Sequence, residues 1–236
     1  MQDIFRFKQF EIDQQKASMK ICTDSCLFGA LIDVANRKKI LDIGTGTGLL
    51  ALMMAQKCDA QIYAIEPDEI NADLAEKNFN SSPWKNNLRL LQYSVQQFTQ
   101  DTDLKFDLIV SNPPFYEKYL PSGNKRKDIA KHNSDLSYQE LVSAIQSLLH
   151  NQGICWILLP VRQMSDFEEI SAQHGIYVSQ RFFIKNRPYE NPIRVVSVFE
   201  KKYSSYILQS EITIRDKDEK HHVLFKNLMR PFYLYL

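Results

Sequence analysis

Short apolar segments with strand character alternate with segments of helical length along most of this chain. Such alternation predicts a mostly parallel sheet with right-handed crossovers and helices on both faces. The connection 186–193 is too short for a crossover, so the last two strands should form an antiparallel hairpin. We therefore predict an α/β fold with a seven-stranded sheet; the expected strands are 38–44, 61–66, 88–93, 106–112, 153–160, 177–185 and 194–202, and the expected helices are 49–57, 69–79, 138–149 and 164–174.

The two ends of the chain add smaller elements to this sheet. Residues 1–36 should form a hairpin and then a helix that begins near Thr23 or Asp24, which are both good N-cap residues. Residues 204–236, which follow the core at 37–203, should form a short strand, a polar turn and an apolar helix. Since no repeat or linker-like stretch interrupts the chain, we expect residues 1–236 to form one domain.

The composition indicates a soluble globular protein. Hydrophobic residues make up 44% of the 236 residues, and no apolar run is long enough to span a membrane. The first residues lack an apolar signal segment, so we expect a cytoplasmic protein. We also expect a monomer with no obligate protein partner. We expect reduced thiols and no metal site, with a Cys22 and Cys26 metal pair as the remote alternative.

A glycine-rich turn, LDIGTGTG, follows the first expected strand of the core. Gly44, Gly46 and Gly48 would let the backbone approach a bound ligand closely. Glu66 ends the next strand, near the ~20-residue spacing at which an acidic side chain accepts ribose hydroxyls. Asp42 would repel a pyrophosphate but attract an ammonium group. S-adenosylmethionine carries an ammonium and no phosphate, so the pattern favours this methyl donor over a nicotinamide dinucleotide.

The fourth expected strand of the core ends in SNPPFY. One Gly or Pro would be enough to end a strand, whereas this segment adds an amide side chain, a second proline and two aromatic rings. The Asn112 side-chain oxygen and the Pro113 carbonyl can accept both hydrogens of a planar amine and favour a tetrahedral nitrogen. Pro114 would brace the turn, Phe115 could stack on a base, and Tyr116 could extend that surface. The alternative is that the prolines only end a strand and Phe115 fills the core, which the glycine-rich turn at the same rim disfavours.

A basic segment, SGNKRKDIAKHN, follows this motif and contains Lys125, Arg126, Lys127 and Lys131. The net charge of the chain is only +1, so any surface for nucleic acid must be local. A solvated loop is the alternative interpretation of such a run. Its place just after SNPPFY favours contacts with phosphates that flank a base flipped into the site.

In this order, LDIGTGTG, AIEP and FDLIVSNPPFY resemble the motifs of the Rossmann-like (class I) methyltransferases, and NPPF is typical of those that methylate amines. The front segment FKQFEIDQQKASMKICTDSCLFGA, SPW at 82–84 and the tail RPFYLYL are more narrowly similar to the bacterial tRNA adenine-N6 methyltransferases. That family modifies the adenine just 3′ of the anticodon in a valine tRNA. The resemblance implies a Rossmann-like fold, S-adenosylmethionine as the cofactor and tRNA as the partner.

The resemblance also implies roles for individual residues. Thr23 and Asp24 would line the methionine end of the cofactor, Glu66 would hold its ribose, and residues 112–115 would hold the target amine. The family usually has Gly at Cys22, and Asp at Ser94 to bind the adenine amine; the Ser94 oxygen can still accept that bond, and the Val95 N–H can serve a ring nitrogen. The implied cofactor residues are Lys20, Thr23, Asp24, Asp42, Gly44, Thr45, Gly46, Gly48, Glu66, Pro67, Ser94, Val95 and Asn112.

Three other functions remain open on the sequence. A glutamine-amide methyltransferase that acts on a protein would use NPPF equally well, because a carboxamide is also a conjugated amine. Guanine-N2 methylation of ribosomal RNA and a non-catalytic RNA-binding module are the other two. The basic segment and the front and tail segments favour tRNA.

Overall fold

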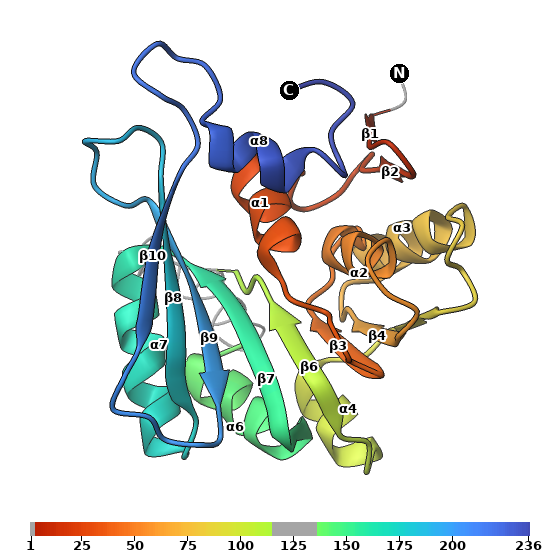
Figure 1. The fold of residues 1–236 in the computed structure, drawn as a ribbon. Helices are drawn as coiled ribbons and strands as arrows, with labels where there is room; N and C mark the ends of the chain where they lie inside the picture. Colours follow the sequence, from red (N-terminus) through yellow and green to blue (C-terminus); the bar gives the residue numbers. More distant parts are fainter. Residues whose placement is uncertain (1–2, 115–135) are drawn as a thin grey trace, which may run out of the picture.

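A large sheet of eight strands forms the centre of the structure, a computed structural model that describes residues 3–114 and 136–236 (Figure 1). Its strands run in the order β10-β8-β9-β7-β6-β3-β4-β5, and a separate antiparallel hairpin, β1-β2, lies near the start of the chain. The strands are β1 (Ile4–Arg6), β2 (Glu11–Asp13), β3 (Lys39–Ile43), β4 (Gln61–Ile65), β5 (Leu88–Leu91), β6 (Phe106–Ser111), β7 (Leu149–Leu159), β8 (Tyr177–Lys185), β9 (Arg194–Glu200) and β10 (Leu208–Thr213).

The pairing confirms the predicted mostly parallel sheet with a late antiparallel hairpin. Among the described strands of the eight-stranded sheet, only β9 runs against its neighbours, because the short connection 186–193 turns it back beside β8. The sheet has one strand more than the predicted seven. After β9, residues 201–207 lead the chain past the start of β8, so that β10 pairs in parallel with β8 at the edge (Figure 1).

The described helices are α1 (Thr23–Leu31), α2 (Leu49–Ala55), α3 (Glu69–Asn80), α4 (Val95–Asp101), α6 (Tyr138–Leu148), α7 (Val161–Gln173) and α8 (Val223–Met229). None of these helices, which belong to the described part of the chain, has the length and apolar character needed to cross a membrane. Two differ from the sequence prediction. Cys22, rather than Thr23 or Asp24, is the N-cap of α1, because Cys22 is the last residue with extended backbone angles. Helix α4 was not predicted, although the capping box of Ser94 and Gln97 marks its start.

The strands of the sheet direct alternate side chains into two apolar layers. In β7, Trp156 and Leu158 pack with α1, α2, α3 and α8 on one face, whereas Cys155 and Ile157 pack with α4, α6 and α7 on the other. This period of two is the geometry of a strand covered on both sides. The expected helical layers on both faces are therefore present.

The three segments on which the narrower family resemblance rests meet in one aromatic cluster. The Phe7 ring from the front segment stacks on Phe10 with 4.5 Å between centroids, and Phe10 packs edge-on against Trp84 at 5.9 Å. Phe7 also forms a β-bridge with Tyr233 of the tail, and the Lys8 N–H donates to the Phe232 carbonyl at 2.8 Å. The front segment, SPW and the tail therefore pack against each other in the folded chain.

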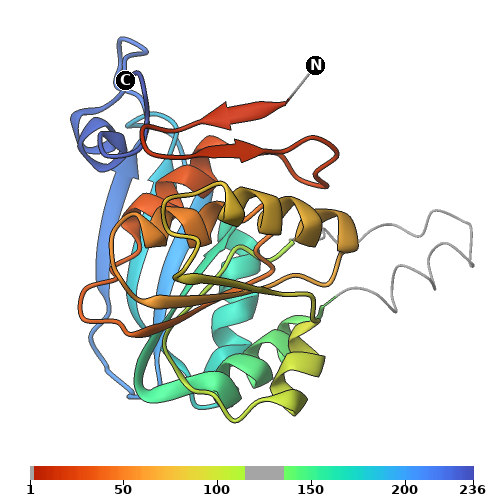
Figure 2. The ribbon, with the colours of Figure 1, turned by 90° about the vertical axis from the view of Figure 1, so that its right-hand side faces the viewer.

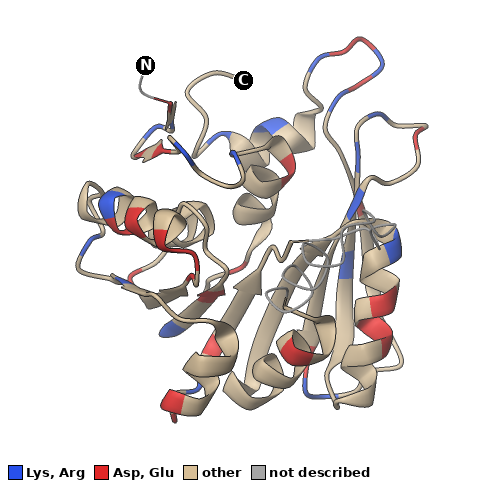
Figure 3. Ribbon diagram, turned by 180° about the vertical axis from the view of Figure 1, so that it is seen from behind, with Lys and Arg blue, Asp and Glu red and all other residues tan. Residues whose placement is uncertain are grey.

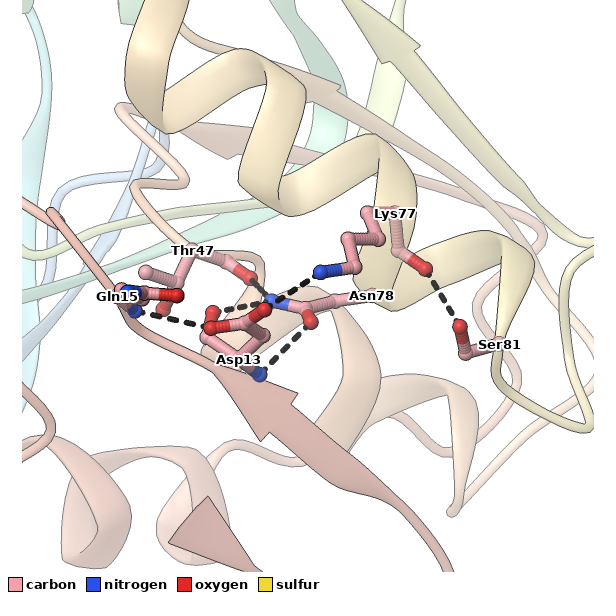
Figure 4. A network of polar contacts seen from close by, with 6 residues as sticks. All are labelled: Asp13, Gln15, Thr47, Lys77, Asn78 and Ser81. Carbon is pink, nitrogen blue, oxygen red and sulfur yellow. Dashed lines mark hydrogen bonds and ion pairs between the residues drawn. The ribbon is translucent and has the colours of Figure 1, made fainter. Parts of the chain in front are cut away.

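Asn78 on α3 joins the hairpin to the glycine-rich turn. Its side-chain oxygen accepts from the Asp13 N–H at 2.9 Å, and its Nδ2 donates to the Asp13 carbonyl at 3.1 Å and the Thr47 carbonyl at 2.9 Å (Figure 4). Lys77 adds an ion pair to Asp13 at 2.6 Å. In Figure 2 the hairpin lies along the side of the molecule that carries α3. The buried Asn78 amide thus links three segments that are far apart in the sequence.

We predict that Asn78→Leu lowers the free energy of unfolding by about 2–4 kcal/mol, since each buried backbone group left without a partner costs about 1–3 kcal/mol. Urea-induced unfolding measures the change. Ser81→Ala at the C-cap of the same helix is the control: its exposed hydroxyl makes one bond to the Lys77 carbonyl, so a change within about 0.5 kcal/mol is expected. Equal effects of the two substitutions would contradict the linking role of Asn78.

Candidate active site

The carboxyl ends of four parallel strands lie in register and form one rim. Ile43 at the end of β3 pairs with Ile65 of β4 on one side and with Ser111 of β6 on the other, and Ile65 pairs with Leu91 of β5. The chain leaves β3 toward β4 and β5 in one direction and reaches β6 and β7 in the other, so the strand order reverses beside β3. Ligands of open α/β sheets bind at such a point, outside the carboxyl ends of the strands.

The glycine-rich turn is fastened to the end of β4. The N–H groups of Gly44 and Thr45 donate to the Ile65 carbonyl at 2.9 Å and 3.1 Å. Gly44 and Gly46 have φ angles of +70° and +58°, and a Cβ built on either residue would meet no atom within 4 Å. The backbone here borders open space, which is the room that a bound ligand needs. Gly48 differs, because its Cβ would lie 2.5 Å from the Phe79 ring, so it serves the packing of α2 against α3.

Glu66 is held at this turn by backbone donors. Its Oε2 accepts from the Gly46 N–H at 2.8 Å and its Oε1 from the Asp68 N–H at 3.1 Å. Burial raises the pKa of the Glu66 carboxyl, and the hydrogen bonds from Gly46 and Asp68 oppose this shift. The carboxylate, followed by the exposed Pro67, is therefore fixed beside the open glycine turn, as its predicted role with a ribose requires.

Asp42 presents a buried carboxyl oxygen without a partner. Its Oδ2 accepts from the Thr45 hydroxyl at 2.6 Å, whereas its Oδ1 has no hydrogen-bond partner within the described ranges. Burial raises the Asp42 pKa to about 7 and the Glu66 carboxylate adds to the shift, whereas the Thr45 hydroxyl and the Ala51 N–H oppose it. A buried oxygen without a donor beside an open cradle fits a ligand that brings its own donor or positive charge. The observation agrees with a cofactor that carries an ammonium group.

Asn112 extends the end of β6 into the rim. Its Nδ2 donates to the Ser25 hydroxyl of α1 at 3.2 Å, and its buried Oδ1 has no partner among the residues that the structure describes. The preceding Ser111 hydroxyl donates to the Ile43 carbonyl at 2.8 Å, which ties this turn to β3. Pro113 is buried and Pro114 exposed. The predicted residues Phe115, Tyr116, Lys125, Arg126, Lys127 and Lys131 lie outside the described residues.

The predicted residues at the front of the chain have partners that the sequence did not indicate. Thr23 and Asp24 lie in the first turn of α1, and the Asp24 Oδ2 pairs with the Arg194 Nε of β9 at 2.9 Å. The Lys20 ammonium pairs with Asp3 at 2.6 Å. The roles proposed for Lys20, Thr23 and Asp24 toward the methionine end of the cofactor stay predictions.

Ser94 and Val95 stand at the end of the rim that follows β5. The Ser94 hydroxyl accepts from the Gln97 N–H at 3.2 Å and donates to the Gln97 Oε1 at 3.0 Å, so it caps α4. The Ser94 oxygen keeps one lone pair, with which it could accept the predicted hydrogen bond from the adenine amine of the cofactor. Val95 is the first residue of α4, and its N–H therefore lies outside the hydrogen-bond ladder of the helix. Their contacts with the cofactor's adenine stay predictions.

Three residues near the rim were missed in the sequence analysis. Ser25 contacts Asn112, and Arg194 contacts Asp24. Asn71 on α3 accepts from the Ser18 N–H at 3.2 Å and donates to its hydroxyl at 2.8 Å, which fastens the segment before α1 to α3. Their partners are 53 or more residues away in the chain, and no local pattern marks such contacts.

The strand order, with the glycine-rich turn and the fixed carboxylate at its reversal, defines a class I methyltransferase fold. Solved structures agree with this architecture. A protein of Agrobacterium tumefaciens described as a predicted O-methyltransferase aligns with a TM-score of 0.68 at 14% identity, over 88% of this chain and 95% of that chain. The ribosomal protein L11 methylase of Lactobacillus delbrueckii subsp. bulgaricus aligns with a TM-score of 0.58 at 18% identity, over 81% of this chain and 84% of that chain.

Sequence comparison narrows the class to one family. The model of the methyltransferase small domain matches residues 18–163. The tRNA1(Val) (adenine(37)-N6)-methyltransferase of Cytophaga hutchinsonii is 37% identical, over 98% of this chain and 98% of that protein. The one of Dyadobacter fermentans is also 37% identical, over 98% and 97%. The chain belongs to the family of tRNA1(Val) (adenine(37)-N6)-methyltransferases, which confirms the resemblance seen in the sequence.

We predict that the raised pKa of Asp42 makes stability depend on pH in a defined direction. Between the ordinary value of 3.8 and about 7, the folded chain keeps a proton that the unfolded chain releases, so stability falls as pH rises through this window. The free energy of unfolding of the wild type, minus that of Asp42→Asn, should decrease across the window and level off above it. Urea unfolding at a series of pH values measures this difference, and a flat difference would show a carboxyl already ionised at low pH.

We predict that Glu66→Ala weakens the binding of S-adenosylmethionine by about 10- to 100-fold, the value of a hydrogen bond to a charged group. Isothermal titration calorimetry measures the affinity. Glu69→Ala is the matched control, because it removes an exposed carboxylate of the same charge at the start of α3. An affinity that Glu66→Ala leaves unchanged would reject the ribose-binding role.

Proposed function

We propose that the chain transfers a methyl group from S-adenosylmethionine to the N6 amine of an adenine in tRNA, immediately 3′ of the anticodon in a valine tRNA. The observation that carries the chemistry is the buried Asn112 Oδ1 without a described partner, beside the glycine-rich turn. Support for the substrate comes from relatives of that name, which align over nearly the whole chain.

The residues around the rim fit the cofactor that this reaction needs. The open backbone at Gly44 and Gly46, the fixed Glu66 carboxylate and the unsatisfied Asp42 oxygen would hold its sugar and its amino-acid part. When bound, S-adenosylmethionine supplies a methyl group on a sulfonium, which is a good leaving group. The contribution of the protein is then mainly alignment, which can lower a barrier by roughly 7–11 kcal/mol.

Asn112 and Pro113 would prepare the amine. The lone pair of an adenine amine is delocalised into the ring, so the nitrogen is a weak nucleophile. The Asn112 Oδ1 and the Pro113 carbonyl would each accept one amine hydrogen and favour the tetrahedral nitrogen that reacts. The nitrogen becomes acidic as it is alkylated, and water can remove its proton. The neutral Asn112 amide therefore acts by hydrogen bonding and not as a base.

Recognition of the RNA is proposed from the sequence. In the view of Figure 3, α3 and α7 each carry more acidic than basic residues, so neither helix offers a basic surface to RNA. The basic run that follows SNPPFY in the sequence consists of Lys125, Arg126, Lys127 and Lys131. These residues would contact phosphates that flank the flipped adenine, and Phe115 and Tyr116 would stack on the base. We further propose that the chain acts as a monomer in the cytoplasm.

The proposal is tested by incubating the protein with unfractionated tRNA and labelled S-adenosylmethionine, followed by mass spectrometry of the digested nucleosides. Labelled N6-methyladenosine is the expected product, and valine tRNA should carry it. In parallel incubations with ribosomal RNA or with protein substrates, label in N2-methylguanosine or in a glutamine would replace the proposal with one of the alternatives.

We predict that Asn112→Ala lowers kcat by about 100-fold or more, as does the loss of one hydrogen-bonding group from a preorganised transition-state site. Calorimetry should show that the variant still binds S-adenosylmethionine. Asn151→Ala is the control, because it removes an exposed amide from the opposite end of the sheet, near the start of β7. Near-normal turnover of Asn112→Ala would refute the acceptor role.

A further inference from the structure

The side chain of Asn112 has two ends of similar shape and opposite polarity. Its oxygen accepts hydrogen bonds and its NH2 group donates them, so only one orientation of the amide can accept from an amine. The reverse orientation would aim two N–H donors at the amine hydrogens. The proposed function, on which this inference rests, therefore requires a contact that holds the amide in one orientation.

We propose that Ser25 is the positioning residue that sets the orientation of the Asn112 amide. The Ser25 oxygen lies 3.2 Å from the Asn112 Nδ2, and only 6% of the residue is exposed. With its nitrogen bound in this way, the amide directs Oδ1 away from Ser25 and leaves it without a described partner. The acceptor that the reaction needs is therefore the end of the amide that Ser25 does not use.

Cys22 favours the direction of this hydrogen bond. A serine hydroxyl can donate as well as accept, so Ser25 alone could bond either end of the amide. The Cys22 Sγ lies 3.0 Å from the Ser25 oxygen, on the side of the N-cap. The hydroxyl is a better donor than a thiol, and a proton given to sulfur leaves the Ser25 lone pairs for the Asn112 Nδ2. The chain of hydrogen bonds thus runs from the Asn112 Nδ2 to the Ser25 oxygen, and from the Ser25 hydroxyl to the Cys22 sulfur.

Helix α1, which carries Ser25, is anchored at both of its ends. In its first turn Asp24 pairs with Arg194 at 2.9 Å. At its other end the Lys57 ammonium donates to the carbonyls of Gly29 and Ala30 at 3.0 Å and 3.4 Å, and also to that of Ile32. A group on a rigid element places its partner more accurately than a group on a loop. Ser25 is therefore a fixed point from which the amide can be oriented.

The known helix-start roles do not account for the Ser25 side chain. A serine in a first turn commonly bonds at its own helix start, as Ser25 does with Cys22, but this hydroxyl also contacts Asn112 at the end of β6, 87 residues away. A role in stability alone predicts that Ser25→Ala lowers the unfolding temperature and leaves turnover per folded molecule unchanged. The positioning role predicts a loss of kcat through Asn112.

The first measurement is nuclear magnetic resonance of the side-chain amides in 15N-labelled protein, with the Asn112 pair identified by its disappearance in Asn112→Ala. Ser25→Ala should shift this pair and speed its exchange with water, whereas Ser25→Thr, which keeps the hydroxyl, should retain both properties. Ser171→Ala is the control, because it removes a buried hydroxyl that donates to the Phe167 carbonyl of α7. Unchanged Asn112 resonances in Ser25→Ala would overturn the proposal.

The second measurement is steady-state methylation of tRNA. Ser25→Ala should lower kcat by about 10- to 100-fold, the effect of a small misplacement of a reacting group. Ser25→Thr should restore most of the rate, Ser171→Ala should leave kcat within about twofold, and the cofactor affinity of Ser25→Ala should stay within about threefold. In an Asn112→Ala background, Ser25→Ala should have no further effect on kcat.

The two measurements separate this inference from the proposed function. If the wild type fails to methylate adenine in tRNA, the proposed function is overturned, and the amide resonances alone decide whether Ser25 holds Asn112. If the wild type is active, a kcat for Ser25→Ala within twofold of wild type overturns the positioning role. An equal loss in the Asn112→Ala background overturns it as well, because the effect would then not pass through the amide.

Discussion

The in-register pairing of β3 with β4 and β6 is the constraint on which the site depends. Backbone hydrogen bonds place Ile43, Ile65 and Ser111 at one level, so the turns that follow these residues meet at one rim. A shift of one residue in either pairing would turn every following side chain to the other face of the sheet. The glycine-rich turn, Glu66 and Asn112 lie together because this register holds.

Polar groups at the rim are buried before any ligand binds, so each of them needs a hydrogen-bond partner from the protein or from the ligand. The two carboxyl oxygens of Glu66 each accept a hydrogen bond from a backbone N–H, whereas the Asp42 Oδ1 and the Asn112 Oδ1 have no partner among the described residues. Each buried group without a partner costs free energy in the folded chain. A ligand that supplies the missing donors would recover that cost, so the same feature that weakens the fold favours binding.

Helix α1 connects the end of β6 to β9 through two side-chain contacts. It carries Ser25, which contacts Asn112, and Asp24, which pairs with Arg194 of β9. Around it, the front hairpin, the SPW segment and the tail pack in one aromatic cluster, and Asn78 ties that hairpin to the glycine-rich turn. The front segment is therefore tied to the site through Ser25 and Asn78, and SPW and the tail pack against that segment.

The sequence by itself determined the alternating α/β fold, the late hairpin and the positions of the glycine-rich turn, Glu66 and Asn112, because strand periodicity and turn residues are local signals. Tertiary structure alone decided that β10 joins the sheet, that Asp24 pairs with Arg194 and that Ser25 holds one end of the Asn112 amide. These contacts join residues far apart in the chain. Their formation depends on how the layers pack, and no local pattern of residues records that packing.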